Sequence, residues 1–185
     1  MRIDRTPLTS APPYLLEALR ERARTTGDAW HDAELDACAR TAASEIEDHA
    51  GIALLRQSIR LTVRTGPGAV LDLVGPVAEG AEVAAVLIGD GGATEAVSAA
   101  SWWLEAGRFP RLHLSATAPA GLWRITCEAG FGNDFAAVPA DLALAVADQA
   151  TALFDHRGEP EGRHVRQGLT LACARIVARW RRIRA

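Results

Sequence analysis

The spacing of hydrophobic residues changes twice along this chain of 185 residues. Two segments near the start and two near the end repeat their apolar residues every three to four positions, as amphipathic helices do. Between them, short segments alternate apolar and polar residues, which is typical of half-buried strands. Because the strands follow one another between two pairs of helices, this order predicts an α+β fold with antiparallel strands.

The predicted helices carry recognisable start and stop residues. The first covers about residues 13–24, and the second ends at Gly51, where a left-handed glycine is expected. A third helix starts near Pro139, and Gly158 follows its end. The fourth is predicted over about residues 161–184. Its apolar residues form one continuous stripe, which consists of Val165, Leu169, Ala172, Ile176, Trp180 and Ile183.

About six short strands are predicted between the second and third helices. They are expected around residues 59–63, 69–74, 82–89, 102–105, 112–114 and 122–128. The glycine-rich segment 89–92 is expected to form a hairpin turn. We therefore predict a single domain over residues 1–185. Residues 1–51 and 138–185 would form a lobe that resembles a four-helix bundle, and residues 52–137 a small inserted antiparallel β lobe.

Charge is divided unevenly along the chain, although the formal net charge is only −3. The segment 163–185 contains seven arginines and no carboxylate, whereas the preceding residues contain thirteen arginines and all 23 acidic side chains. This segment is therefore expected to bind an anionic partner, either nucleic acid or an acidic protein surface. A solvated helix face with biased composition would give a similar pattern.

The sequence offers little that predicts catalysis. All 20 cationic side chains are arginines, so a Walker-type phosphate loop, a Schiff-base lysine and a lysine general base are excluded. The five histidines show no metal-ligand spacing, and we expect no catalytic residue, no metal site and no cofactor. Cys38, Cys127 and Cys173 are scattered and odd in number, which indicates a reducing compartment rather than a disulfide framework.

Two further features bear on location and contacts. No stretch approaches about 20 uninterrupted apolar residues, and the first ten residues lack the apolar region of a secretory signal. Trp102 and Trp103 are adjacent in a predicted strand, so their rings are expected on opposite faces. Both could pack within the β lobe, or one could contact another subunit, because tryptophan is enriched at interfaces.

Several motifs occur together in a recognisable order. These are "EIEDHAGIALLRQSIRLTVR", the "GPV" at residues 75–77, "WWLEAGRFPRLHL", "ITCEAGFG" and "VPADLALAVADQATALFDHRG". In this order the chain, over about residues 12–160, resembles the head–tail connector proteins of tailed phages, also called adaptor or head-completion proteins. The same family occurs in phage-derived gene transfer agents, and nothing in the sequence separates the two settings.

The resemblance implies a non-enzymatic protein of the particle neck, made in the bacterial cytoplasm. Connectors assemble as a ring of about twelve copies below the portal protein, extend the DNA channel and dock the next neck component, the stopper protein. DNA would pass without sequence-specific contact, and no membrane would be involved. In the family, C-terminal segments engage the portal. Here that role would fall to the stretch from residue 163 to residue 185.

Within that stretch we assign candidate partner-binding residues from their charge and apolar spacing. They are Arg163, Arg166, Arg175, Ile176, Arg179, Trp180, Arg181, Arg182, Ile183 and Arg184. Trp102 and Trp103 are candidates for an intersubunit contact. Deleting residues 163–185 is expected to leave the protein folded but to abolish docking. The alternatives are a nucleic-acid-binding module that uses the basic C-terminal helix, and an enzyme with a scattered site.

Overall fold

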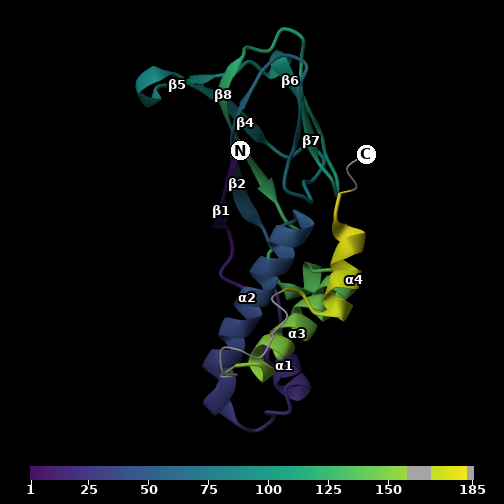
Figure 1. The fold of residues 1–185 in the computed structure, drawn as a ribbon. Coiled ribbons are helices and arrows are strands. Elements are labelled where there is room, and N and C mark those ends of the chain that lie inside the picture. Colours follow the sequence, from purple (N-terminus) through teal and green to yellow (C-terminus); the bar gives the residue numbers. More distant parts are fainter. Residues whose placement is uncertain (158–167, 183–185) are drawn as a thin grey trace. The chain divides into compact units, whose positions relative to one another are not determined.

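The computed structural model describes residues 1–157 and 168–182 (Figure 1). Its described residues form four α-helices and eight strands, which confirms the predicted α+β class. They divide into two compact units. The β unit comprises Met1–Ser10 and Leu55–Phe131, and the helical unit comprises Ala11–Leu54 and Gly132–Ala185.

The β unit contains two antiparallel sheets. The larger has the strand order β1-β2-β8-β4-β5. These strands are β1 (Arg2–Pro7), β2 (Gln57–Thr65), β8 (Gly121–Ala129), β4 (Val83–Ile88) and β5 (Thr94–Ala96). The smaller sheet has the order β3-β7-β6, formed by β3 (Val70–Asp72), β7 (Arg111–Leu114) and β6 (Trp102–Glu105). Short 3-10 turns, Asp90–Gly92 and Ala99–Ser101, precede β5 and β6.

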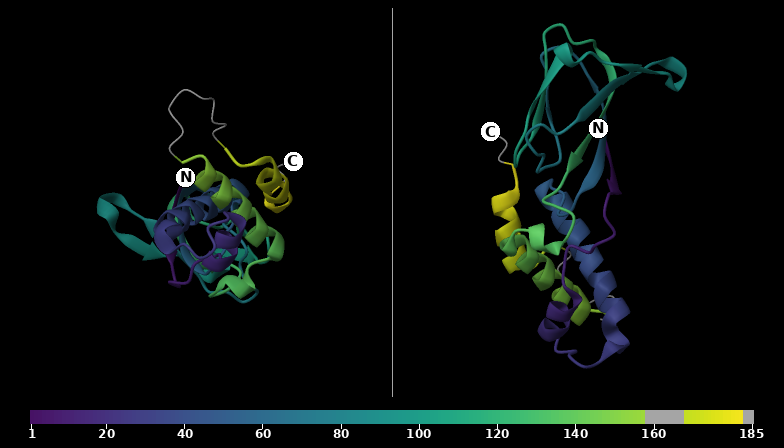
Figure 2. Two further views of the ribbon diagram at one scale, coloured as in Figure 1. Left: turned by 90° about the horizontal axis from the view of Figure 1, so that it is seen from below. Right: turned by 180° about the vertical axis from the view of Figure 1, so that it is seen from behind.

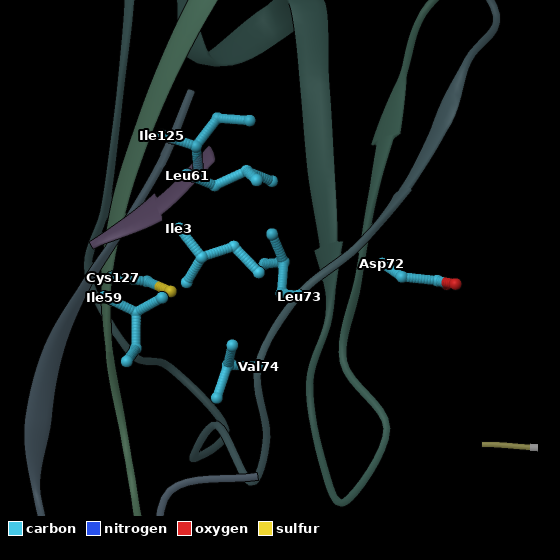
Figure 3. Close-up of a pocket in the computed structure, with 8 residues that line it drawn as sticks. All are labelled: Ile3, Ile59, Leu61, Asp72, Leu73, Val74, Ile125 and Cys127. Atoms are coloured by element: carbon cyan, nitrogen blue, oxygen red, sulfur yellow. The ribbon is translucent and has the colours of Figure 1, made fainter. Parts of the chain in front are cut away.

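One face of the five-stranded sheet forms the core of the β unit. Ile59 and Leu61 of β2 pair in register with Cys127 and Ile125 of β8, and all four side chains are buried. Trp123 is fully buried on the same face, where its Nε1 atom donates to the carbonyl oxygen of Pro119 at 3.0 Å. Figure 3 shows this apolar interior, where the remaining cavity of about 10 Å³ leaves room for about one water molecule.

The "GFG" motif begins with Gly130, whose backbone conformation requires glycine. Its φ of +128° is a conformation that residues with a side chain rarely adopt. A Cβ atom at this position would lie only 2.3 Å from the carbonyl oxygen of Leu55. Because the backbone of Gly130 lies this close to Leu55, the Gly130 amide can donate to the carbonyl of Pro76 at 2.9 Å. This glycine therefore joins three separate segments of the β unit.

The helical unit is formed by α1 (Leu16–Arg22), α2 (Asp32–Ala50), α3 (Ala140–Asp155) and α4 (Leu171–Trp180). Helix α2 packs against α3, and α4 lies alongside α3 (Figures 1 and 2). As predicted, α2 ends at a left-handed glycine, Gly51, with a φ of 69°. Short 3-10 turns precede α2 and α3 at Ala29–His31 and Phe135–Ala137. No described helix has both the length and the hydropathy that a membrane-spanning helix requires.

The strand prediction was incomplete in two places. The expected six strands are present, but β1 and β5 add two edge strands to the five-stranded sheet. Strand β1 pairs with β2 along six residues, so the first ten residues belong to the β unit rather than to the helical lobe. Charged residues are tolerated at a sheet edge, which is why "RIDRTP" forms a strand without an apolar pattern.

The predicted C-terminal helix was too long at both of its described ends. Gly168 has a φ of +145°, and Thr170 caps α4 by accepting a hydrogen bond from the Cys173 amide at 3.1 Å. The helix therefore begins at Leu171 and ends at Trp180, where Arg181 is extended. The parts of the helix prediction over residues 161–167 and 183–184 lie outside the described residues.

Burial of the cysteines gives a testable expectation about their reactivity. Desolvation raises the pKa of the Cys127 thiol to about 11 and that of Cys173 to about 12, and it also raises the pKa of half-buried Cys38. At about pH 8 a thiol reagent should modify Cys38 first and leave Cys127 and Cys173 intact until the protein unfolds. Mass spectrometry of the folded and denatured protein checks this order.

The raised pKa values of the buried thiols determine how the stability of the protein changes with pH. Because the folded state keeps these thiols protonated above their ordinary pKa of 9.0, it binds more protons than the unfolded state there. Stability is therefore expected to fall as the pH rises from about 9 towards 11, as measured by denaturant unfolding. Rapid modification of all three thiols in the folded protein would contradict the burial on which both expectations depend.

Candidate partner-binding surfaces

Helix α4 is attached to α3 at its N-terminal end by a buried polar network. The Gln149 side chain is only 2% exposed, and its Oε1 atom accepts from the Thr170 amide at 2.8 Å. Its Nε2 atom donates to Glu45 Oε2 of α2, also at 2.8 Å. Thr170 Oγ1 donates to Asp148 Oδ2 at 2.5 Å. Gln149 thus connects α2, α3 and the start of α4.

The C-terminal end of α4 is held by a second acidic residue of α3. Trp180 Nε1 donates to Asp141 Oδ2 at 2.9 Å, and Arg179 forms a weaker contact with the same oxygen at 3.4 Å. Between the two ends, Cys173 and Val177 are fully buried. The apolar edge of α4 therefore packs within the helical unit, and Trp180 and Ile176 remain only half-buried.

The opposite side of α4 is cationic and exposed. Arg175, Arg179 and Arg181 are exposed, Arg182 is half-buried, and α4 contains no acidic residue. Within the described part of the chain, Arg175 and Arg181 have no ion-pair partner. Leu171 adds an exposed apolar side chain at the start of the same helix. The remaining candidates of the basic stretch, Arg163, Arg166, Ile183 and Arg184, lie outside the described residues.

The paired tryptophans of β6 are in different environments. Trp103 is 55% exposed and stacks on His113 of β7, with ring centroids 3.7 Å apart and nearly parallel planes. His113 Nε2 in turn lies 3.0 Å from Glu105 Oε2. Trp102 is half-buried, and its Nε1 atom is shielded from solvent. An exposed, pre-stacked Trp103 is suited to a protein contact, and its role in one stays a prediction.

The clearest shifts of carboxylate and phenol pKa values come from structural contacts. Tyr14 donates to Asp36 Oδ1 at 2.5 Å, and Arg40 donates to the other carboxylate oxygen at 2.7 Å. Hydrogen bonds from Arg40 and Tyr14 lower the pKa of Asp36, whereas burial raises that of Tyr14. This group joins the segment before α1 to α2 and faces no pocket identified in the described structure.

A second hollow of the β unit lies at the β4–β5 hairpin, on the edge of the five-stranded sheet. It has a volume of about 310 Å³, is open to solvent and is lined mainly by Leu87, Ile88, Ala93 and Gly121, with Glu95 as its ionisable residue. Among residues 1–157 and 168–182, no three His, Cys, Asp or Glu side chains lie close enough together to hold a metal ion.

Comparison with known proteins gives matches among solved structures alone. No family model matches the chain, and no curated protein matches it. A chain from the neck of an empty gene transfer agent particle, with C6 symmetry, matches at 25% identity and a TM-score of 0.74. A chain from the virion of a native gene transfer agent particle matches at 25% and 0.77, and one from a native neck with C12 symmetry at 26% and 0.70. Each match covers 100% of this chain and 97% of the other.

Proposed function

We propose that this chain, which shares its fold over its whole length with chains of gene transfer agent particles and their necks, is the head–tail connector subunit of such a particle or of a tailed phage. The similarity confirms the resemblance to phage-type connectors that the sequence motifs indicated. The observation that carries the proposal is this coverage of both chains from end to end. A shared module would match over only part of one of them.

In the proposed assembly, about twelve copies form a ring below the portal protein, extend the DNA channel and dock the stopper protein. Two of the similar chains come from necks with C6 and C12 symmetry, which supports a ring. A ring requires two different surfaces of each subunit to join head to tail. The β unit and the helical unit together would form one adaptor domain. Its role would be structural, without catalysis or a cofactor, in a neck assembled from protein made in the bacterial cytoplasm.

We assign portal binding to the cationic side of α4. Its arginines are exposed, while the apolar edge of the helix is used within the helical unit. An acidic portal surface would be attracted to arginines repeated around a ring. The exposed ring of Trp103 is the proposed contact with a neighbouring subunit.

The proposal is tested by mixing the purified chain with its portal protein. We expect a closed ring on the portal, seen by electron microscopy, and a mass that corresponds to many copies of the chain. The chain incubated without portal is the control, since it separates self-assembly from docking. Persistent monomers that never associate with the portal would contradict the proposed function.

A second candidate function is nucleic-acid binding through α4. The observation that favours it is the exposure of Arg175 on a helix without acidic residues and of Arg181 directly after that helix. It predicts DNA affinity that depends on these two residues. The variant Arg175→Gln/Arg181→Gln tests it. Loss of DNA affinity in this variant would support nucleic-acid binding at α4, and retained affinity would assign DNA binding to another surface.

A further inference from the structure

The outer face of the five-stranded sheet carries a cluster of arginines. Residues 58–64 of β2 alternate between the buried core and this face, which places Arg60 and Arg64 outside together with Thr62. On the neighbouring strand, Arg124 pairs in register with Thr62. Arg124 therefore lies diagonally between Arg60 and Arg64, at about 7–8 Å from each by the usual geometry of paired strands.

These three arginines have no acidic partner in the described structure. No ion pair involves Arg60, Arg64 or Arg124 among the described residues, and the Nε atom of Arg124 is shielded from solvent without a hydrogen-bond acceptor. The acidic residues of the same face, Asp4 and Glu128, pair with Arg2 and Arg56 instead. Asp4 is in register with Arg60 on β1, but its carboxylate bonds to Arg2. The three arginines therefore remain without an ion pair in the part of the chain that the structure describes, so a bound anion would stabilise this face.

The chemistry of the cluster matches a phosphodiester backbone. Arginine guanidinium groups bind phosphate with paired hydrogen bonds, and the hydroxyls of Thr62 and Thr126 on the same face are further donors. Arg60 and Arg64 are separated by about 13 Å of strand, enough to contact several phosphates of one DNA strand. The cluster itself contains no aromatic side chain for base stacking, so contact would not depend on sequence.

We propose that this arginine face, formed by Arg60, Arg64 and Arg124, is a sequence-independent binding site for the phosphate backbone of duplex DNA. The inference rests on the proposed function, in which DNA passes through the assembled neck. It assigns the DNA contact to the β unit and leaves α4 for the protein partner. An acidic protein surface is the competing ligand, and it could also contact half-buried Leu122 and Val86, which are in register with Arg64 and Arg124. The spacing of the three cations along the paired strands favours a phosphodiester backbone.

The test measures binding of the whole chain to a fluorescent duplex of about 30 base pairs over a range of salt concentrations. Three phosphate contacts predict that affinity falls about 40-fold between roughly 50 and 200 mM salt. Arg60 and Arg64 are exposed, so both can be changed without disturbing the core. The double variant Arg60→Gln/Arg64→Gln should bind DNA at least about tenfold more weakly at the lower salt concentration. The slope of log affinity against log salt concentration should fall by the equivalent of about two phosphate contacts.

Two matched variants with the same change of charge serve as controls. Arg24→Gln/Arg40→Gln, at exposed positions of the helical unit, should bind DNA as the parent does, although Arg40→Gln removes the ion pair with Asp36. Arg175→Gln/Arg181→Gln should also retain DNA binding while it weakens portal binding. Unchanged DNA affinity in Arg60→Gln/Arg64→Gln would overturn the inference, as would loss confined to the α4 variant. Stronger binding of polyglutamate than of DNA would assign the face to an acidic protein instead.

The outcomes separate the two proposals. If the parent never docks on the portal but its DNA binding depends on Arg60 and Arg64, the connector role is wrong and the DNA site stands. If docking occurs and DNA binding is absent or independent of these residues, the connector role stands and the DNA site is wrong.

Discussion

Replacing Arg175 and Arg181 with glutamate is expected to weaken binding to the portal protein by roughly 100-fold, or about 3 kcal/mol. Arg175 is exposed on α4 and Arg181 is exposed directly after its end, so an acidic portal surface would meet two repulsive charges where it met two attractive ones. Biolayer interferometry with immobilised portal measures the change. The effect should shrink at high salt, because exposed charges are screened.

The matched control is Arg24→Glu/Arg40→Glu, which changes the net charge equally at exposed positions elsewhere in the helical unit. It should retain portal binding within about threefold, because α4 is unchanged. Since Arg40→Glu also breaks the ion pair with Asp36, circular dichroism must show that this variant is folded. Equal weakening by both variants would mean that overall charge, and not the face of α4, determines docking. These point variants are sharper than the deletion of residues 163–185, which would also remove buried Cys173 and Val177.

Replacing Gln149 with leucine is expected to lower the free energy of unfolding by about 2–4 kcal/mol. Leucine has a similar volume, so the loss would come from polar groups rather than from a cavity. The amide of Thr170 would lose its acceptor and the carboxylate of Glu45 would lose its donor. Thr170 and Glu45 are half-buried, and a hydrogen bond contributes about 0.5–1.5 kcal/mol between neutral groups and about 1.5–3 kcal/mol with a charged group. Urea denaturation followed by circular dichroism measures the difference.

Thr151→Ala is the matched control for this substitution. Thr151 lies half a turn further along α3, and its hydroxyl donates only to the carbonyl of Ala147 in its own helix. Its removal should cost less than about 1 kcal/mol. A loss in Gln149→Leu no larger than in this control would show that the junction of α2, α3 and α4 does not depend on the amide. Portal binding should fall together with stability if α4 must be held in place to dock.

The elements with strong local signals could be predicted from sequence. The end of α2 was fixed by a glycine at the left-handed position, Gly51, and β2 by the alternation of Ile59 and Leu61 with polar residues. These signals come from the residues of the element itself and do not depend on distant contacts. The edge strands lacked them: β1 is stabilised by pairing with residues of β2 that lie 50 to 60 positions away, rather than by an apolar pattern.

The candidate site was predicted only in part for a similar reason. The cationic character of α4 follows from composition, but its attachment through Gln149 and Asp141 depends on side chains of another helix. The signal that was available and missed is Thr170, a residue type that favours helix N-caps, directly before the run "LACARIV". Similarly, Arg60 and Arg64 lie on the polar side of a predicted strand, but Arg124 joins them only through strand pairing.

The strand order of the larger sheet has a consequence for synthesis of the protein. Strand β1 leaves the ribosome first, its partner β2 follows only at residues 57–65, and the central strand β8 is the last of the five, ending at residue 129. Neither β2 nor β4 has its full set of neighbours until β8 has emerged. The nascent chain therefore holds unpaired strand edges for most of translation, which favours chaperone engagement and makes refolding of the full-length chain slow relative to a helical protein of equal size.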